Sequence, residues 1–233
     1  MNTGQQEWDV MKITTQKFVS PRRCALAAAI AAMGIATVAY AYTTDVDARG
    51  QIQNISGGHR FIIQQRTDTT PGRAELRGTS STTGVSATGR FKLVSGGKWV
   101  SLMQVLNVVA AGQTSGPSEP VTQLAIRPKS GTSNFEFYIV QGGQLCSGAP
   151  TVTVGTYYTI SMSVSTGQSP SYYINGVKCQ KSNPDGDRAG TVYDGGQLKT
   201  GRHFYAKMGA YNTTSNLTNS GGGSTVEWTE INI

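Results

Sequence analysis

Three side chains that could transfer or attract a proton lie in one short stretch near the C-terminal end, HFYAKMGAYN (203–212). Apolar residues alternate with the others in this stretch, which predicts a β-strand with one apolar face. Tyr205, Lys207 and Tyr211 share the opposite face. A phenol acts as a base only when nearby cations favour its phenolate form, and Lys207 could supply that charge. We expect Gly209 to leave room for a chain-like ligand; an exposed strand with cross-strand aromatic pairs is the alternative.

A second group of charged residues is the segment RAELR (73–77). Alternation places Arg73, Glu75 and Arg77 on one face of a predicted strand. Two guanidinium groups held by a carboxylate between them suit bidentate capture of another carboxylate. Taken alone, the segment is better explained as a solvated, salt-bridged outer face.

A third candidate is Gln104, an isolated amide in the otherwise apolar segment KWVSLMQVLNVV. A buried glutamine has to be hydrogen-bonded. It is therefore either a satisfied core amide or a donor directed into a cleft, and the segment alone favours the core amide.

Ten short segments that alternate between apolar and polar residues are predicted to be the strands that position these groups. They are residues 59–66, 73–78, 89–93, 99–109, 122–128, 134–140, 157–165, 171–174, 204–211 and 225–233. Asn175-Gly176 in YYINGVKC is typical of a two-residue hairpin turn. Short strands with turn residues between them predict an all-β fold, a sandwich or jelly roll of two antiparallel sheets, in one domain over residues 42–233.

In chain order, the three segments read RAELR (73–77), QVL (104–106) and YAKMGAYN (205–212). They resemble the R-x-E-L-R, Q-V-x and Y-x-K-x-G-x-Y-N motifs of the alginate lyases of polysaccharide lyase family 7. The resemblance spans most of the chain after residue 41. It implies a concanavalin-like jelly roll whose concave sheet binds an acidic polysaccharide and cleaves it without a metal or another cofactor. The glucuronan lyases of family 20 are a related possibility.

The resemblance also implies roles for individual residues in β-elimination, which removes the C5 proton of a uronate and expels the sugar linked at O4. The developing enediolate must be stabilised, and the implied ligands of the carboxylate are Arg73 and Gln104. The implied catalytic phenol is Tyr211, first as base and then as acid. The residues implied to line or brace the cleft are Lys207, Arg77, Glu75 and Tyr205.

One position departs from the motif, because Leu106 stands where members of the family have a histidine. The chain has two histidines, His59 and His203. If the first two predicted strands form a hairpin, His59 shares a face with Arg73, and we count it among the candidate catalytic residues. A hydrogen-bonded surface histidine is the alternative. His203 lies at the end of the third motif's strand.

The absence of that histidine has a stereochemical consequence. In β-1,4-linked mannuronate and glucuronate, H5 and O4 lie on the same side of the ring, so one tyrosine can serve as base and acid. In guluronate they lie on opposite sides and need two groups. We therefore expect poly-mannuronate or glucuronan to be the substrate.

Residues 1–41 have the pattern of a secretory signal peptide. Four basic residues precede the apolar run CALAAAIAAMGIATVAYA, whose small-x-small end predicts cleavage before Tyr42. An uncleaved membrane anchor is the alternative, and either Met1 or Met11 is the start. We expect a secreted or periplasmic bacterial protein that is monomeric and free of the membrane after cleavage.

The net charge predicts a polyanionic partner. Removal of residues 1–41 takes away four of 20 basic and two of 13 acidic residues, which leaves a net charge of about +5. The sequence has no nucleic-acid-binding motif. An anionic polysaccharide therefore fits an exported basic protein better than a nucleic acid does.

Two cysteines follow the leader, Cys146 and Cys179. In an oxidising compartment we expect them to form a disulfide that stabilises the fold by roughly 2–4 kcal/mol. Two free buried thiols are the alternative.

Two other function classes remain open. A carbohydrate-binding module on the same scaffold has no catalytic activity, and Leu106 favours that class, although the other motif residues are all present. A glycoside hydrolase needs two carboxyl groups in the cleft. Glu75 is one candidate, but the motifs supply no second.

Overall fold

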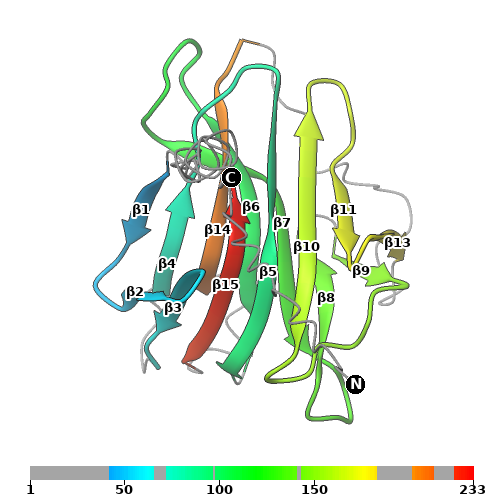
Figure 1. Cartoon of the computed structure of the whole chain (residues 1–233). Helices are drawn as coiled ribbons and strands as arrows, with labels where there is room; N and C mark the ends of the chain where they lie inside the picture. Colours follow the sequence, from blue (N-terminus) through cyan, green and yellow to red (C-terminus); the bar gives the residue numbers. More distant parts are fainter. Residues whose placement is uncertain (1–41, 66–71, 97, 141–142, 183–200, 213–222) are drawn as a thin grey trace, which may run out of the picture. The chain divides into compact units, whose positions relative to one another are not determined.

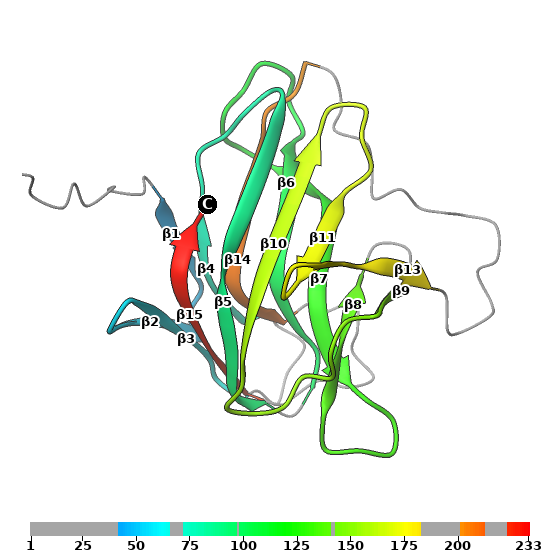
Figure 2. The same ribbon diagram turned by 45° about the vertical axis from the view of Figure 1, so that its right-hand side comes forward.

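The computed structural model describes residues 42–65, 72–96, 98–140, 143–182, 201–212 and 223–233. Their regular structure is β-strand, and no helix in these ranges is long and apolar enough to span a membrane. The strands form two antiparallel sheets that face each other (Figures 1 and 2). The predicted signal peptide, residues 1–41, lies outside the described residues.

The first sheet has eight strands in the order β1-β4-β14-β6-β7-β8-β9-β13. The bounds are β1 (Thr43–Val46), β4 (Gly72–Arg77), β14 (Phe204–Asn212), β6 (Val100–Val108), β7 (Ser118–Pro128), β8 (Phe135–Ile139), β9 (Gln144–Ser147) and β13 (Gln180–Ser182). The strands that carry the three motifs, β4, β14 and β6, are direct neighbours in this order. The sheet therefore collects segments more than one hundred residues apart in the chain.

The second sheet has seven strands in the order β12-β11-β10-β5-β15-β3-β2. The bounds are β12 (Val177–Lys178), β11 (Ser171–Ile174), β10 (Tyr157–Ser165), β5 (Gly84–Gly96), β15 (Ser224–Asn232), β3 (Gly58–Ile63) and β2 (Gly50–Ile55). The long strands β5, β10 and β15 lie at its centre.

An aromatic core holds the sheets together. Trp228 of β15 is fully buried, its ring centre lies 5.4 Å from that of Phe91, and Phe91 lies 6.4 Å from Phe137 of the opposite sheet. The indole Nε1 of Trp228 donates a hydrogen bond to the carbonyl oxygen of Gly209, 3.2 Å away. Buried tryptophan usually finds such an acceptor, and here the acceptor belongs to β14. The core therefore fixes the middle of the strand that carries the third motif.

All ten predicted strands are present, with bounds that differ by a few residues, except for β5, which is much longer than predicted. The hairpin of β11 and β12 confirms the Asn175-Gly176 turn, and both turn residues have positive φ, 51° and 77°. Alternation did not reveal β1, β2, β9, β12 or β13, which are short. The hairpin expected between the first two predicted strands is wrong, because β3 pairs with β2 and β15 and β4 pairs with β1 and β14.

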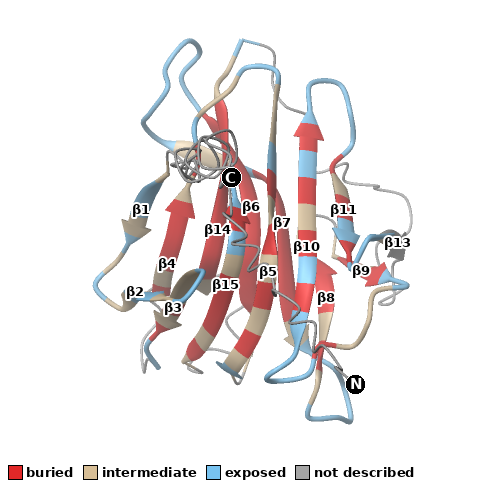
Figure 3. Cartoon of the chain, in the orientation of Figure 1, coloured by how far each residue is buried: buried red, intermediate tan, exposed pale blue. Residues whose placement is uncertain are grey.

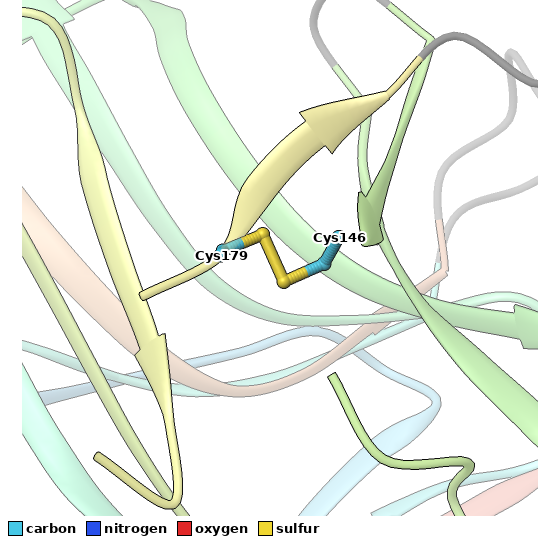
Figure 4. Close-up of a disulfide and its surroundings, with 2 residues drawn as sticks. All are labelled: Cys146 and Cys179. Atoms are coloured by element: carbon cyan, nitrogen blue, oxygen red, sulfur yellow. A yellow bond between two sulfur atoms is a disulfide. The ribbon is translucent and has the colours of Figure 1, made fainter. Parts of the chain in front are cut away.

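The predicted disulfide between Cys146 and Cys179 is confirmed (Figure 4). Cys146 lies in β9, and Cys179 lies between β12 and β13. The two Cα atoms are 4.9 Å apart. The bond therefore ties the β11–β12 hairpin of one sheet to the edge of the other.

Candidate active site

The two sheets differ in how they present their outer faces, which point away from the core. Strand β10 of the seven-stranded sheet alternates between buried and exposed residues, as expected for a strand with one solvated face. Strand β6 of the eight-stranded sheet is buried at every position, and Figure 3 shows the contrast. Its outward-facing polar residues Ser101 and Gln104, which lie opposite Tyr211 and Lys207 of β14, are therefore packed against other side chains. The outer face of the eight-stranded sheet is the candidate site.

Strand register brings the motif residues together on this face. Lys207 of β14 lies opposite Arg77 of β4 and Gln104 of β6. Four pairs further along β14, Tyr211 lies opposite Arg73. The alternation that the sequence predicts for the first and third motifs is thus the one that the structure has.

Glu75 is the centre of a buried polar network. Its Oε1 accepts a hydrogen bond of 2.6 Å from Nε2 of Gln104, and Gln104 Oε1 accepts one of 3.0 Å from Gln123. Its Oε2 lies 3.2 Å from Nε of Arg73 and 3.6 Å from Nζ of Lys207. Burial raises the pKa of Glu75 to about 7, against the charges of Lys207 and Arg73 and the Gln104 hydrogen bond, which lower it. The carboxyl is therefore poised to change its charge near neutral pH.

Asp45 joins this network from β1, and the sequence analysis did not identify it. It lies opposite Glu75 in the β1–β4 pair, its Oδ2 accepts a hydrogen bond from Lys207, and it lies 3.4 Å from Nη1 of Arg73. Although partial burial opposes ionisation, Lys207 and the arginines lower the pKa of the Asp45 carboxyl below its ordinary value. The signal that could have found Asp45 is weak, since TTDV has no apolar alternation.

Arg73 and Tyr211 form the accessible part of the site. The guanidinium carbon of Arg73 lies 4.6 Å from the centre of the Tyr211 ring, and the Arg73 side chain keeps 30% of its surface exposed. Burial opposes the charge of Arg73, but Glu75, Asp45 and the hydroxyl of Tyr211 raise its pKa above the ordinary value. The result is a permanently charged guanidinium against a phenol at the solvent boundary.

Lys207 is not the cation that contacts Tyr211. The two residues are four positions apart on one strand, a separation of roughly 13 Å, and the ammonium group of Lys207 pairs with Asp45 and Glu75. Its side chain is only 3% exposed. The positive charge beside the Tyr211 phenol, which the sequence analysis assigned to Lys207, is therefore that of Arg73.

The space beside Gly209 is occupied by the β4 backbone and is not open to a ligand. Its φ is +153°, and a Cβ atom there would lie 2.3 Å from the carbonyl oxygen of Ala74 and 3.0 Å from Phe61. The pairing of β14 with β6 also shifts register between Met208 and Tyr211. The missing side chain thus admits the backbone of β4, and the expectation that it opens space for a ligand is wrong.

Arg77 and Tyr205 lie at the other end of the motif strands. The Arg77 guanidinium carbon is 3.8 Å from the Tyr205 ring centre, and Arg77 Nη2 donates a hydrogen bond of 3.0 Å to the carbonyl oxygen of Thr114. Tyr205 is buried in a small apolar cluster with Leu106 and Val108. Leu106 therefore faces the same side as Gln104 and packs on Tyr205.

Neither histidine lies beside Tyr211. His59 is in β3 of the seven-stranded sheet, on the inward side with Phe61, and its Nε2 lies 2.7 Å from the hydroxyl of Tyr42. Partial burial lowers the pKa of His59 below its ordinary value, which favours the neutral ring. His203 precedes β14, eight residues from Tyr211, or roughly 26 Å along an extended chain. The structure therefore separates His59 from the other predicted site residues.

Within the described ranges, no group of three His, Cys, Asp or Glu side chains is placed to hold a metal ion. The residues that meet on the outer face are instead three cations, two carboxyl groups, two amides and a phenol, namely Arg73, Arg77, Lys207, Asp45, Glu75, Gln104, Gln123 and Tyr211. Such a set can bind a carboxylate and move a proton.

No protein-family model and no curated protein matches the sequence. Solved structures do match. The PL7 alginate lyase AlyA1 from Zobellia galactanivorans aligns with a TM-score of 0.54 and 14% identity over 84% of this chain and 84% of its own. The alginate lyase PA1167 from Pseudomonas aeruginosa aligns with a TM-score of 0.50 and 16% identity over 78% of this chain and 84% of its own. This chain has the jelly-roll fold of these alginate lyases.

The jelly roll predicted from the sequence is thus confirmed, and so is its likeness to family 7 at the level of the fold. The fold is a scaffold that polysaccharide lyases use. Because one fold can carry many activities, the reaction has to be argued from the side chains on its surface. The likeness to the family 20 glucuronan lyases remains a prediction.

Proposed function

We propose that the protein is an exported polysaccharide lyase that cleaves a β-1,4-linked polyuronate by β-elimination, with poly-mannuronate or glucuronan as its substrate. The observation that carries the proposal is the contact of Arg73 with Tyr211 at the edge of the buried network around Glu75. It joins a permanent cation for the uronate carboxylate to a phenol for proton transfer.

In the proposed reaction, the phenolate of Tyr211 takes the proton from C5 of the uronate. The electron pair of the C5–H bond passes through the enediolate of the carboxylate and forms the C4–C5 double bond as the C4–O4 bond breaks. Tyr211 then returns the proton to O4, which leaves as the anomeric hydroxyl of the other fragment. The phenolate is regenerated, and no oxidant or metal is consumed.

Arg73 supplies the electrostatic stabilisation that this reaction needs. A guanidinium directed at the carboxylate favours the enediolate, in which negative charge accumulates on the carboxylate oxygens. Asp45 lies 3.4 Å from the same guanidinium. The substrate carboxylate therefore competes with Asp45 for Arg73, while Glu75 holds the guanidinium in place from the buried side.

Gln104 acts in this proposal through its neighbours as well as on the substrate. Its side-chain oxygen and nitrogen both have partners, Gln123 and Glu75, and it is only 2% exposed. It keeps the Glu75 carboxyl in position, and its remaining amide hydrogen is the one that can reach a substrate carboxylate. Lys207 and Arg77 brace the face, and Tyr205 fills its far end.

The substrate preference follows from the histidines. With His59 in the other sheet and His203 at the far end of β14, Tyr211 has no imidazole partner. A single proton-transfer group suits a substrate whose H5 and O4 lie on one side of the ring. We therefore propose Tyr211 as both base and acid, and we give His59 no part in the reaction.

Export is part of the proposal. Residues 1–41 are proposed to be a signal peptide removed before Tyr42, which leaves one secreted or periplasmic domain over residues 42–233. The disulfide between Cys146 and Cys179 supports an oxidising compartment. The basic net charge supports an anionic polysaccharide as the partner.

A second candidate is a carbohydrate-binding module without activity. The observation in its favour is that Leu106 packs on Tyr205 where the family motif has a histidine. The groups that such a module would need, Arg73 and Arg77, are the same ones that a lyase would use.

One assay separates these possibilities. The protein is incubated with poly-mannuronate, poly-guluronate, glucuronan and a neutral glucan. Two quantities are measured over time, the ultraviolet absorbance of the unsaturated uronate and the concentration of new reducing ends. We expect absorbance to rise with poly-mannuronate or glucuronan. Reducing ends without absorbance would identify a hydrolase, and binding without either would identify a module. Faster cleavage of poly-guluronate than of the other polymers would overturn the substrate preference.

A further inference from the structure

A second aromatic and charged cluster lies on the outer face of the eight-stranded sheet, outside the three motifs. The rings of Trp99 and Tyr138 meet edge to face with their centres 4.7 Å apart. The guanidinium carbon of Arg127 lies 4.3 Å from the Tyr138 ring centre and 5.8 Å from that of Trp99. Its Nε donates a hydrogen bond of 2.7 Å to Glu136. We call these four residues the Trp99 cluster.

Strand register places the Trp99 cluster on the same face as Tyr211. Tyr211 lies opposite Ser101 of β6, Ser101 lies opposite Ala125 of β7, and Ala125 lies opposite Tyr138 of β8. Ser101 and Ala125 are small, so no large side chain from β6 or β7 stands in this row between the two tyrosines. Trp99 precedes Ser101 by two residues, which puts its Cα roughly 8 Å from that of Tyr211.

The cluster has the chemistry of a uronate subsite. The flat face of an indole packs on the C–H groups of a pyranose ring, and a guanidinium pairs with its carboxylate. Trp99 is partly exposed, and the Arg127 side chain keeps 17% of its surface exposed. Glu136 and Tyr138 fix the orientation of Arg127, so little side-chain entropy would be lost when it binds a ligand.

We propose that Trp99 and Arg127 form a second binding subsite that holds a further uronate residue of the polymer whose reacting sugar lies against the exposed side of Arg73 and Tyr211. The proposal rests on the proposed function in taking a polyuronate as the ligand. The polymer crosses from β14 over Ser101 to β7 and β8, and only a chain that extends beyond the reacting sugar reaches the subsite. Trp99 is a binding residue in this proposal and takes no part in proton transfer.

The opposite sheet offers a matched control. Tyr157 of β10 also lies near two cations, with the Arg90 guanidinium carbon 4.9 Å and the Lys92 Nζ 4.8 Å from its ring centre. It is an exposed aromatic residue on the outer face of the seven-stranded sheet. If polyuronate is attracted to any aromatic and cationic surface, Tyr157 should contribute to binding as much as Trp99 does. If the proposed subsite is specific, only Trp99 should contribute.

The first test is calorimetric binding of mannuronate and glucuronate oligosaccharides by the full chain carrying Tyr211→Phe, which prevents turnover. Trp99→Ala should weaken binding of a hexasaccharide about five- to ten-fold and leave binding of a single uronate monosaccharide unchanged. Trp99→Phe should restore most of the loss, and Tyr157→Ala should have no effect. Equal hexasaccharide affinity with and without Trp99, or an equal loss with Tyr157→Ala, would overturn the subsite.

The second test leaves the subsite intact and so does not depend on the folding of a Trp99 variant. The proposed domain over residues 42–233 has two tryptophans, Trp99, which is partly exposed, and Trp228, which is fully buried. Acrylamide quenching therefore reports on Trp99. A bound hexasaccharide should reduce quenching, and binding without any change in quenching would overturn the proposal.

Failure of the subsite and failure of the proposed reaction give different results. If the hexasaccharide protects Trp99 but no unsaturated product forms from any polymer, the lyase reaction is wrong and the subsite stands. If product forms and Trp99 is not protected, the subsite is wrong and the reaction stands. If no polyuronate binds, both are wrong.

Discussion

Replacing Glu75 by glutamine should remove a pH dependence that this buried carboxyl imposes on the stability of the fold. Glu75 is 1% exposed and lies between Arg73, Lys207 and the amide of Gln104. Glutamine has nearly the same size and cannot ionise. The substitution therefore changes the titration with little change in packing.

The magnitude follows from the two protonation states. Burial raises the pKa of Glu75 from 4.5 to about 7 in the folded protein. Between these pH values the folded protein keeps a proton that the unfolded chain releases, so the free energy of unfolding falls as the pH rises. At about 1.4 kcal/mol for each pH unit, the loss amounts to about 3 kcal/mol. The stabilisation that protonated Glu75 gives the folded protein is fully present below pH 4.5 and is lost by about pH 7. The free energy of unfolding does not change further through this group at higher pH.

Urea denaturation at a series of pH values measures this effect. Titrating groups that do not contact Glu75, such as His59, contribute equally to the wild type and to Glu75→Gln, so they cancel in the difference between the two proteins. We expect the wild type to lose about 3 kcal/mol relative to the variant between pH 4.5 and pH 7.5. A difference that stays constant over this range would refute the raised pKa, and with it the description of Glu75 as poised near neutrality.

Three further changes test the packing around the site and the fold that supports it. Lys207→Met should lower the free energy of unfolding by about 3 kcal/mol at pH 8, because it leaves a buried carboxylate without its ammonium partner, and by clearly less at pH 5; equal losses at both pH values would contradict the network. Gly209→Ala should cost about 2 kcal/mol or more in urea denaturation, because its Cβ would meet the Ala74 carbonyl oxygen at 2.3 Å; a neutral result would restore the view that the glycine faces open space. Replacing Cys146 and Cys179 by serine opens a loop with a sequence separation of 33 and should lower stability by about 3–4 kcal/mol; unchanged thermal unfolding would show that the bond does not constrain the unfolded chain.

Local periodicity was enough to predict most of the face that carries the candidate site. A strand turns alternate side chains to opposite sides, so the segment around Tyr211 and the segment around Arg73 each revealed their polar face without any knowledge of their partners. The resemblance to family 7 then related segments that lie more than one hundred residues apart. The structure confirms that these strands are neighbours in the sheet order β4-β14-β6.

The parts that sequence reasoning missed depend on pairing between distant segments. Asp45 lies in a four-residue edge strand, and it belongs to the site only because β1 pairs with β4. His59 was placed wrongly because neighbouring strands were expected to form a hairpin, whereas β3 pairs with β15 at the end of the chain. Gly209 was misinterpreted because a sequence does not show that the β4 backbone approaches it.

The central claim, that Tyr211 transfers the proton in β-elimination, is tested most directly by the rate of unsaturated-product formation in Tyr211→Phe. The matched control is Tyr173→Phe, which removes the hydroxyl of an exposed tyrosine on the opposite sheet. We predict that Tyr211→Phe lowers kcat on poly-mannuronate or glucuronan by about a thousand-fold while calorimetric binding of the polymer changes little, and that Tyr173→Phe matches the wild type. A Tyr211→Phe protein that releases unsaturated product at the wild-type rate would contradict the account.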